Sequence, residues 1–329
     1  MTDQADRLRK LAELAGRSGF ASKANEMGAS QQSTMGESHQ SAARQTVLET
    51  NRGSLKRTRV LAVTSGKGGV GKTSVVANLA IALSQSGLRV LVVDADLGLA
   101  NIDVLLGLRT RFNLGHVVSG QKSLEDIIVE GPAGVRIIPG ASGLKDLAEI
   151  EAGRRHALLA DLVSLDEESD LLMIDTGAGI SSNVMDFVVS ADEVIVVTTP
   201  EPTAIADAYA MIKVLSQVSP DTYIRLLVNQ ARNAAEAAQV SDQISSVAQR
   251  FLNVYVDKLG YVFADVAVQK SVRAQKPFVL LYPHSSASEC IKALAQRLAT
   301  GRPVRAAPSG IAGFVTRMLS AVGRRYDGS

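Results

Sequence analysis

The feature that most constrains the fold is a series of short apolar runs separated by segments of helix length. The runs are VLAVTS, RVLVVDAD, VRIIPG, DLLMIDTG, EVIVVTTP, YIRLLVNQ and YVFAD, and between most of them lie segments such as 72–86, 154–165, 202–217 and 233–252. Uninterrupted Val, Ile and Leu strands that alternate with helices are typical of a parallel sheet covered on both faces. We therefore predict an α/β domain over residues 56–300, with a doubly wound, mostly parallel sheet and helices on both faces.

The composition excludes several other classes of protein. The chain has 329 residues, of which 46% are hydrophobic and only Cys290 is a cysteine. Its apolar runs are too short for a membrane-spanning helix, which needs about 20 residues. A single cysteine excludes a disulfide framework or a metal site made of cysteines alone, and it indicates a reducing compartment. Because no signal peptide pattern opens the chain, we expect a cytoplasmic protein.

Charge is distributed unevenly along the chain. The net charge of the whole chain is +2. Its C-terminal segment, residues 297–329, has six basic residues and one acidic residue. Residues 56–296 instead carry 22 basic and 26 acidic residues. This asymmetry predicts that the C-terminus contacts something anionic, a membrane surface or a nucleic acid, and that the body does not.

A phosphate-binding loop directly follows the first predicted strand. Residues 65–74 read SGKGGVGKTS, which matches the pattern G-x-x-x-x-G-K-[ST] between a strand and a helix. The glycines let backbone N–H groups surround phosphate oxygens at the start of a helix, where the helix dipole favours an anion. We expect Lys72 to neutralise the β and γ phosphates and the Thr73 hydroxyl to bind Mg²⁺. The predicted ATP contacts here are Gly66, Lys67, Gly68, Gly69, Val70, Gly71, Lys72, Thr73 and Ser74.

Acidic residues end two of the predicted strands. Asp94 and Asp96 end the second strand, and Asp175 closes the run LLMID. Doubly wound sheets bind ligands at the carboxyl ends of their strands, so the three carboxylates are expected to face the phosphates. Asp175 suits a ligand of Mg²⁺ or its water, and Asp96 suits the group that orients the attacking water.

The second lysine of the loop, Lys67, needs a different explanation. It cannot easily share the concave side of the loop with Lys72. It fits better as a cation that reaches a nucleotide bound by another copy of the chain, as arginine fingers do. This interpretation makes dimerisation part of catalysis.

Together, GKGGVGKT, DADLGLANID and IDTGAGI resemble the motifs of the deviant Walker A ATPases, the group of MinD and ParA. The resemblance covers residues 58–300. It implies that Lys67 acts across a dimer that sandwiches ATP. It also implies that Asp94 and Asp175 serve Mg²⁺ and that Asp96 positions the hydrolytic water.

Other features choose among the branches of this group. The group's adenine contact matches Asn229, although Gln230 stands where arginine is common. One cysteine disfavours the nitrogenase iron protein and the cluster carriers, and a single C-terminal tyrosine, Tyr326, disfavours the tyrosine kinases of this fold. The acidic body disfavours a DNA-binding partition ATPase, so DNA is not an expected partner. Of the branches of this group, the membrane-positioning branch therefore fits the sequence best.

Residues 1–15 indicate one type of member within that branch. They predict a short helix, in which DQADRLR resembles the DQAxxLR motif of FlhG proteins, the MinD-like ATPases that control flagellar number and placement. In those proteins the motif binds the signal-recognition-type GTPase FlhF and stimulates its GTP hydrolysis. The resemblance implies a GTPase-activating helix in which Gln4 orients water, and its residues are Asp3, Gln4, Ala5, Leu8 and Arg9. Residues 16–55 predict a flexible linker, because they hold almost no aromatic or β-branched residues.

The C-terminus predicts a basic amphipathic helix at residues 311–325, after a linker at 301–310. Its apolar positions recur at helical spacing with Arg317 beside them, and they are Ile311, Phe314, Val315, Met318, Leu319 and Val322. Such a helix either lies in a lipid interface or docks on the protein's own core.

The whole sequence predicts an FlhG-type ATPase that dimerises when ATP is bound. It would associate reversibly with the inner face of the cell membrane and activate an FlhF-like GTPase. Flagellar switch-complex proteins and a flagellar transcription regulator are further partners compatible with the resemblance. The alternatives are a ParA-like partition ATPase that loads onto DNA and a MinD-type ATPase that positions the division site.

Overall fold

The computed structural model describes residues 57–96, 102–140, 161–300 and 309–326. These residues belong to one compact unit, Lys56–Ser329, and the other unit is Met1–Leu55. The predicted activating helix and the linker after it therefore lie outside the described residues.

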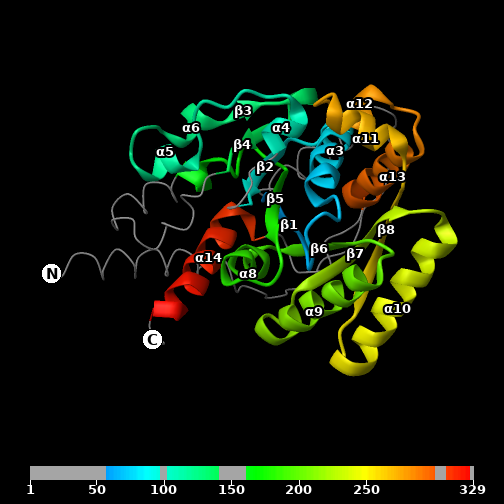
Figure 1. Cartoon of the computed structure of the whole chain (residues 1–329). Helices are drawn as coiled ribbons and strands as arrows, with labels where there is room; N and C mark the ends of the chain where they lie inside the picture. Colours follow the sequence, from blue (N-terminus) through cyan, green and yellow to red (C-terminus); the bar gives the residue numbers. More distant parts are fainter. Residues whose placement is uncertain (1–56, 97–101, 141–160, 301–308, 327–329) are drawn as a thin grey trace, which may run out of the picture. The chain divides into compact units, whose positions relative to one another are not determined.

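A single eight-stranded sheet forms the centre of the domain (Figure 1). Its strand order is β3-β4-β2-β5-β1-β6-β7-β8, and the neighbours are parallel except for the antiparallel edge pair β3 and β4. The strands are β1 (Arg59–Ser65), β2 (Val90–Ala95), β3 (Val129–Glu130), β4 (Arg136–Ile138), β5 (Leu171–Ala178), β6 (Glu193–Thr198), β7 (Tyr223–Ala231) and β8 (Val256–Phe263). The sheet confirms the predicted fold class.

Helices cover both faces of this sheet (Figure 1). Those on one face are α3 (Lys72–Gln85), α4 (Ile102–Leu106), α12 (Phe278–Leu281) and α13 (Ser286–Thr300). Those on the other are α5 (Leu114–Val118), α6 (Leu124–Ile127), α8 (Ser182–Ser190), α9 (Pro202–Val218), α10 (Ala234–Leu252) and α14 (Gly310–Tyr326). Two further short helices are η1 (Pro132–Gly134) and α11 (Val266–Arg273).

The core consists of two layers of buried side chains, one on each face of the sheet. Alternation along β1 separates them, because Val60 and Ala62 point into one layer while Leu61 and Val63 point into the other. All four side chains are fully buried. A strand buried on both faces has no polar positions, which is why its sequence shows an uninterrupted apolar run.

Most element boundaries lie close to the predicted ones, but β8 begins earlier than the run YVFAD. β8 is an edge strand that starts at Val256, and pairs of partly or fully exposed residues such as Asp257 and Lys258 separate its buried side chains. A strand that is half exposed does not produce a continuous apolar run. The run YVFAD therefore marks only the C-terminal end of β8.

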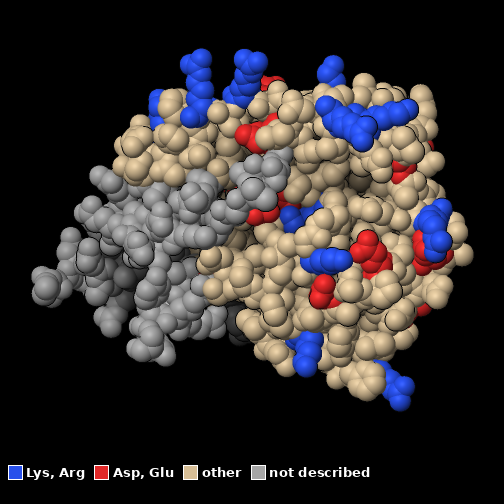
Figure 2. Space-filling view, in the orientation of Figure 1, with Lys and Arg blue, Asp and Glu red and all other residues tan. Residues whose placement is uncertain are grey.

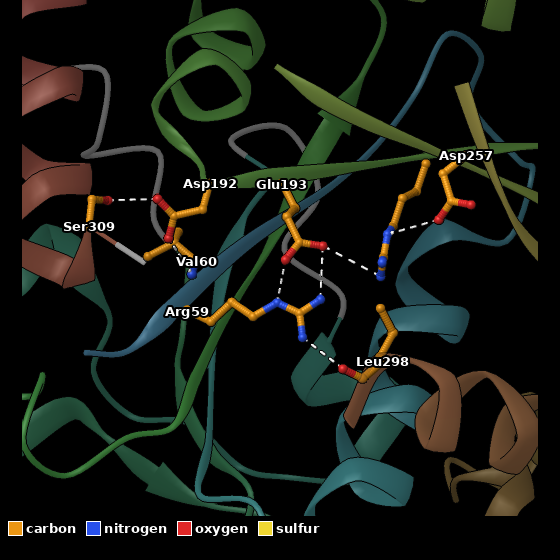
Figure 3. Close-up of polar contacts among 8 residues, drawn as sticks. Arg59, Val60, Asp192, Glu193, Asp257, Leu298 and Ser309 are labelled. Carbon is orange, nitrogen blue, oxygen red and sulfur yellow. Dashed lines mark hydrogen bonds and ion pairs between the residues drawn. The ribbon is translucent and has the colours of Figure 1, made fainter. Parts of the chain in front are cut away.

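The C-terminal helix α14 docks on the ATPase domain. Its four buried apolar side chains are each 5% exposed or less and pack beside α8, and they are Ile311, Phe314, Val315 and Met318. Arg317 donates from Nε to the Ser190 carbonyl at 2.8 Å, and its Nη2 lies 3.0 Å from Asp192 Oδ1. The Ser309 hydroxyl also donates to Asp192, at 2.6 Å (Figure 3). Of the two predicted arrangements, the structure shows docking on the protein's own core.

Two predicted residues of this helix, Leu319 and Val322, have side chains outside the described part. No helix among the described residues is long and apolar enough to cross a membrane.

Candidate functional site

The loop between β1 and α3 has the backbone of a phosphate-binding loop. Gly69 and Gly71 adopt left-handed conformations, with φ of 81° and 83°, which favour glycine. Gly71 is also the N-cap of α3, and no side chain caps the helix there. The first N–H groups of α3 therefore point out of the helix without a side-chain partner, as an anion site requires.

Lys72 and Asp175 form a buried ion pair behind this loop. Lys72 is 6% exposed and Asp175 is fully buried, and the Lys72 Nζ lies 2.7 Å from Asp175 Oδ1. Burial raises the pKa of the Asp175 carboxyl, and the positive charge of Lys72 opposes that rise. The second oxygen, Oδ2, is buried and accepts no hydrogen bond within the described part of the chain. A buried carboxylate oxygen without a donor suits a cation or a cation-bound water.

Asp94 lies on the same side of the sheet as Asp175, because the two are directly paired between β2 and β5. Asp94 is 1% exposed and accepts hydrogen bonds from the backbone N–H of Asp96 at 3.1 Å and of Ile102 at 3.3 Å. Asp96 Oδ1 would stand 3.6 Å from a Cβ placed on Gly177. The structure thus brings the acidic ends of both strands together, as predicted from their positions.

These carboxylates alone do not complete a metal site. Within the described ranges, no three His, Cys, Asp or Glu side chains gather where they could hold a metal ion. Mg²⁺ usually takes one or two carboxylates and completes its shell with water and substrate phosphates. The residues therefore fit a magnesium ion that binds together with a nucleotide, with the Thr73 hydroxyl as a further oxygen ligand.

Lys67 contacts the beginning of α9, whereas Lys72 contacts Asp175. Its Nζ lies 3.0 Å from Glu201 Oε2 and 3.0 Å from the Thr203 hydroxyl. The Lys67 side chain is 39% exposed. Neither Glu201 nor Thr203 was predicted as a site residue, although both follow β6 at the same edge of the sheet as the recognised motifs. Their position after a buried apolar strand was the signal that could have identified them.

Asn229 is tied to the phosphate-binding loop. Its Nδ2 donates to the Val70 carbonyl at 2.7 Å, and the residue is 7% exposed. A Cβ on Gly71 would lie 2.5 Å from that nitrogen. The next residue, Gln230, has a φ of 59°, which is uncommon for a residue other than glycine. The contact connects the end of β7 with the loop, and the role of Asn229 at the adenine stays a prediction.

Comparisons with known proteins agree with this geometry. A family model described as an AAA domain matches residues 58–228. The antiactivator FleN of Pseudomonas aeruginosa is 41% identical over 268 residues, which cover 81% of this chain and 95% of FleN. The flagellum site-determining protein YlxH of Helicobacter pylori is 34% identical over 271 residues, which cover 81% of this chain and 91% of YlxH. The chain belongs to the MinD/ParA family of P-loop ATPases.

A solved member of the MinD/ParA family supports the same assignment. The septum site-determining protein MinD from Pyrococcus horikoshii, in complex with Mg-ADP, is 26% identical to this chain with a TM-score of 0.60. The match covers 74% of this chain and 96% of that MinD. Membership confirms the predicted ATPase activity. FleN and YlxH confirm the predicted relation to FlhG, the flagellar branch of the MinD/ParA family.

Proposed function

We propose that this chain is an FlhG-type ATPase that dimerises around two ATP–Mg²⁺ sites and regulates the number or placement of flagella. The observation that carries the proposal is the meeting of the phosphate-binding loop with Asp94, Asp96 and Asp175 at one edge of the sheet. The similarity to FleN and YlxH supports the flagellar assignment.

Different residues of the chain are expected to bind the phosphates and Mg²⁺. Lys72 would exchange its contact with Asp175 for the β and γ phosphates, and the loop N–H groups would hold the phosphate oxygens. Thr73, Asp94 and Asp175 would hold Mg²⁺, which when bound supplies positive charge that stabilises the phosphates.

Two further residues complete the proposed reaction. Asp96 orients the attacking water and accepts a hydrogen bond from it. Lys67 would leave Glu201 and Thr203 to reach the nucleotide of a second copy. The arrangement seen here is then the one adopted before dimerisation.

Two substitutions test the catalytic assignment. Asp96→Ala should lower the rate of ATP hydrolysis about 100-fold while nucleotide binding persists, because a water-orienting carboxylate contributes roughly that factor. Lys67→Ala should abolish ATP-dependent dimerisation, measured by light scattering, and spare most nucleotide binding by the monomer. Asp242→Ala, which removes an exposed carboxylate of α10, serves as the control. Hydrolysis by Asp96→Ala at the wild-type rate would show that the assignment is wrong.

The proposed activation of an FlhF-like GTPase rests on the resemblance of residues 3–9 to the FlhG motif. A synthetic peptide of residues 1–15 should raise the rate of GTP hydrolysis by such a GTPase. The same peptide with Gln4→Ala should not, because it lacks the amide that would orient water. Equal stimulation by both peptides would contradict the role of Gln4.

The proposed membrane association requires that α14 leave its docked position, because its apolar side chains are buried. We infer that ATP-driven dimerisation releases the helix, and that two helices per dimer bind more strongly than one. ATP should then strengthen flotation with lipid vesicles, and this increase should be lost in Phe314→Asp, with Thr316→Asp as an exposed control on the same helix. If duplex DNA binds instead, with an affinity that falls steeply with salt, a partition ATPase is the better assignment.

A further inference from the structure

Two segments far apart in the sequence form one surface at the end of α4 and around α11 and α12. The turn after α4 contacts the turn after α11, because a Cβ on Gly107 would lie 2.8 Å from the Gln275 carbonyl oxygen. Both turns use positive φ angles, 65° at Gly107 and 51° at Gln275, which bring the backbones close. In Figure 2, the upper edge of the molecule, where Figure 1 places β3, α4, α11 and α12, carries several basic side chains.

The exposed cations of these two segments are here named the basic face, and they are Arg109, Arg111, Lys270, Arg273 and Lys276. None of them forms an ion pair with any residue that the structure describes. The neighbouring carboxylate, Asp103, accepts a hydrogen bond from the Thr110 hydroxyl at 2.8 Å. The net charge of residues 56–296 is negative, yet folding gathers on this face cations that have no ion-pair partner among the described residues.

Exposed apolar side chains lie on the helices of the same two segments. Val104 on α4 and Val272 on α11 are 48% and 43% exposed, and Leu280 and Leu281 on α12 are 40% and 37% exposed. At a nucleic-acid interface these apolar groups would face phosphates, and no aromatic side chain of the two segments is exposed for a base to stack on, because Phe112 is partly buried and Phe278 is buried. A lipid interface instead accepts cations at the headgroups and apolar side chains just below them.

We propose that the basic face binds an anionic lipid surface directly, without α14. This contact goes beyond the proposed function, because it can operate while the apolar side of α14 remains buried on the ATPase domain. Each Lys or Arg near an anionic membrane contributes about 1 kcal/mol, and the contribution is screened by salt. Binding through this face is therefore expected to be weak, rapidly reversible and independent of nucleotide.

The test uses the full-length protein without nucleotide in a vesicle co-sedimentation assay. The vesicles are phosphatidylcholine with about one third phosphatidylglycerol, and phosphatidylcholine alone for comparison. Wild type should bind only the anionic vesicles, and the binding should fall as salt is raised. The variants Arg109→Glu with Arg111→Glu, and Lys270→Glu with Arg273→Glu, should each bind at least about thirtyfold more weakly, because each removes two favourable charges and adds two that the anionic surface repels.

A matched control reverses two exposed charges elsewhere, Lys213→Glu on α9 and Arg250→Glu on α10, and should bind like wild type. Melting temperatures show whether each variant is folded. The double variant Leu280→Ser with Leu281→Ser should weaken binding without changing net charge. An equal loss in the control, or no nucleotide-free binding to anionic vesicles, would overturn the proposal.

Two other outcomes would also overturn it and would identify a different occupant. If the charge reversals leave vesicle binding intact but abolish binding to a duplex DNA probe, the face recognises nucleic acid. If they change only ATP-dependent dimerisation, the face contacts a second copy of the chain.

Discussion

Individual glycines of the phosphate-binding loop differ in what surrounds them. A Cβ on Gly66 would lie 2.2 Å from the backbone carbonyl oxygen of Asp207 in α9, whereas a Cβ on Gly68 would meet nothing within 4 Å among the described residues. Backbone atoms of a packed helix cannot move aside as the end of a side chain can. Packing against α9 therefore leaves no room for a side chain at Gly66, whereas the described residues leave room for one at Gly68.

This difference predicts opposite outcomes for two similar substitutions. Gly66→Ala should cost about 1 to 3 kcal/mol of folding free energy, because the loop or α9 must shift, and ATP binding should weaken with it. Gly68→Ala should leave the melting temperature within the experimental error. Thermal unfolding and nucleotide titration of both variants provide the check. Equal melting temperatures for the two variants would contradict the predicted contact with Asp207.

At the scale of elements, α14 is attached through an apolar stripe and a small set of polar contacts. Asp166 Oδ1 accepts the backbone N–H of Ile311 at 3.1 Å, and Asp192 contacts both Ser309 and Arg317. Asp192 also accepts the backbone N–H of Val60 at 3.0 Å, so the helix is connected to the beginning of β1 (Figure 3). The strand that carries the phosphate-binding loop at one end thus contacts α14 at the other.

These contacts predict how readily α14 detaches. Arg317→Ala removes a hydrogen bond to the Ser190 carbonyl and the contact with Asp192, which should destabilise docking by about 1 to 2 kcal/mol. Amide hydrogen exchange in residues 310–326 should become about tenfold faster, while exchange in β1 stays unchanged. Thr316→Ala, which removes a hydroxyl that donates to the Ala312 carbonyl of the same helix, should have little effect. Unchanged exchange in Arg317→Ala would mean that the apolar stripe alone holds the helix.

At the scale of the whole molecule, a buried charge network connects four parallel strands at the end opposite the phosphate-binding loop. Glu193 on β6 forms a two-pronged ion pair with Arg59 on β1, and its Oε2 lies 3.4 Å from Arg225 Nη1 on β7 (Figure 3). Arg225 Nε lies 3.2 Å from Asp257 Oδ2 on β8. Glu193 and Arg225 are 2% and 4% exposed, so water cannot replace a lost partner.

Removing the central charge should therefore destabilise the whole domain. Glu193→Gln leaves the partly buried Arg59 without its carboxylate and the buried Arg225 with Asp257 alone, which should cost about 3 kcal/mol of folding free energy. The exposed pair of Lys258 and Asp242 provides the comparison, and Asp242→Asn should cost less than about 1 kcal/mol. Urea denaturation of both variants measures the difference. Similar midpoints for the two would show that the buried network contributes little.

The sequence by itself determined the features that depend on local pattern. The loop motif at residues 66–74 and the strands buried on both faces are encoded by neighbouring residues, so their positions and the α/β class could be predicted. The convergence of Asp94 with Asp175 also followed, because the carboxyl ends of parallel strands meet at one edge. Family membership then followed from the order of these motifs.

Only the tertiary structure decided which distant residues touch. The partners of Lys67, the contact between Gly107 and Gln275, and the docking of α14 each join segments that no local periodicity relates. An amphipathic helix has the same sequence pattern whether its apolar side meets lipid or protein, so the pattern could not choose between them. Likewise, net charge is a sum along the chain, whereas a charged surface depends on which side chains folding places next to one another.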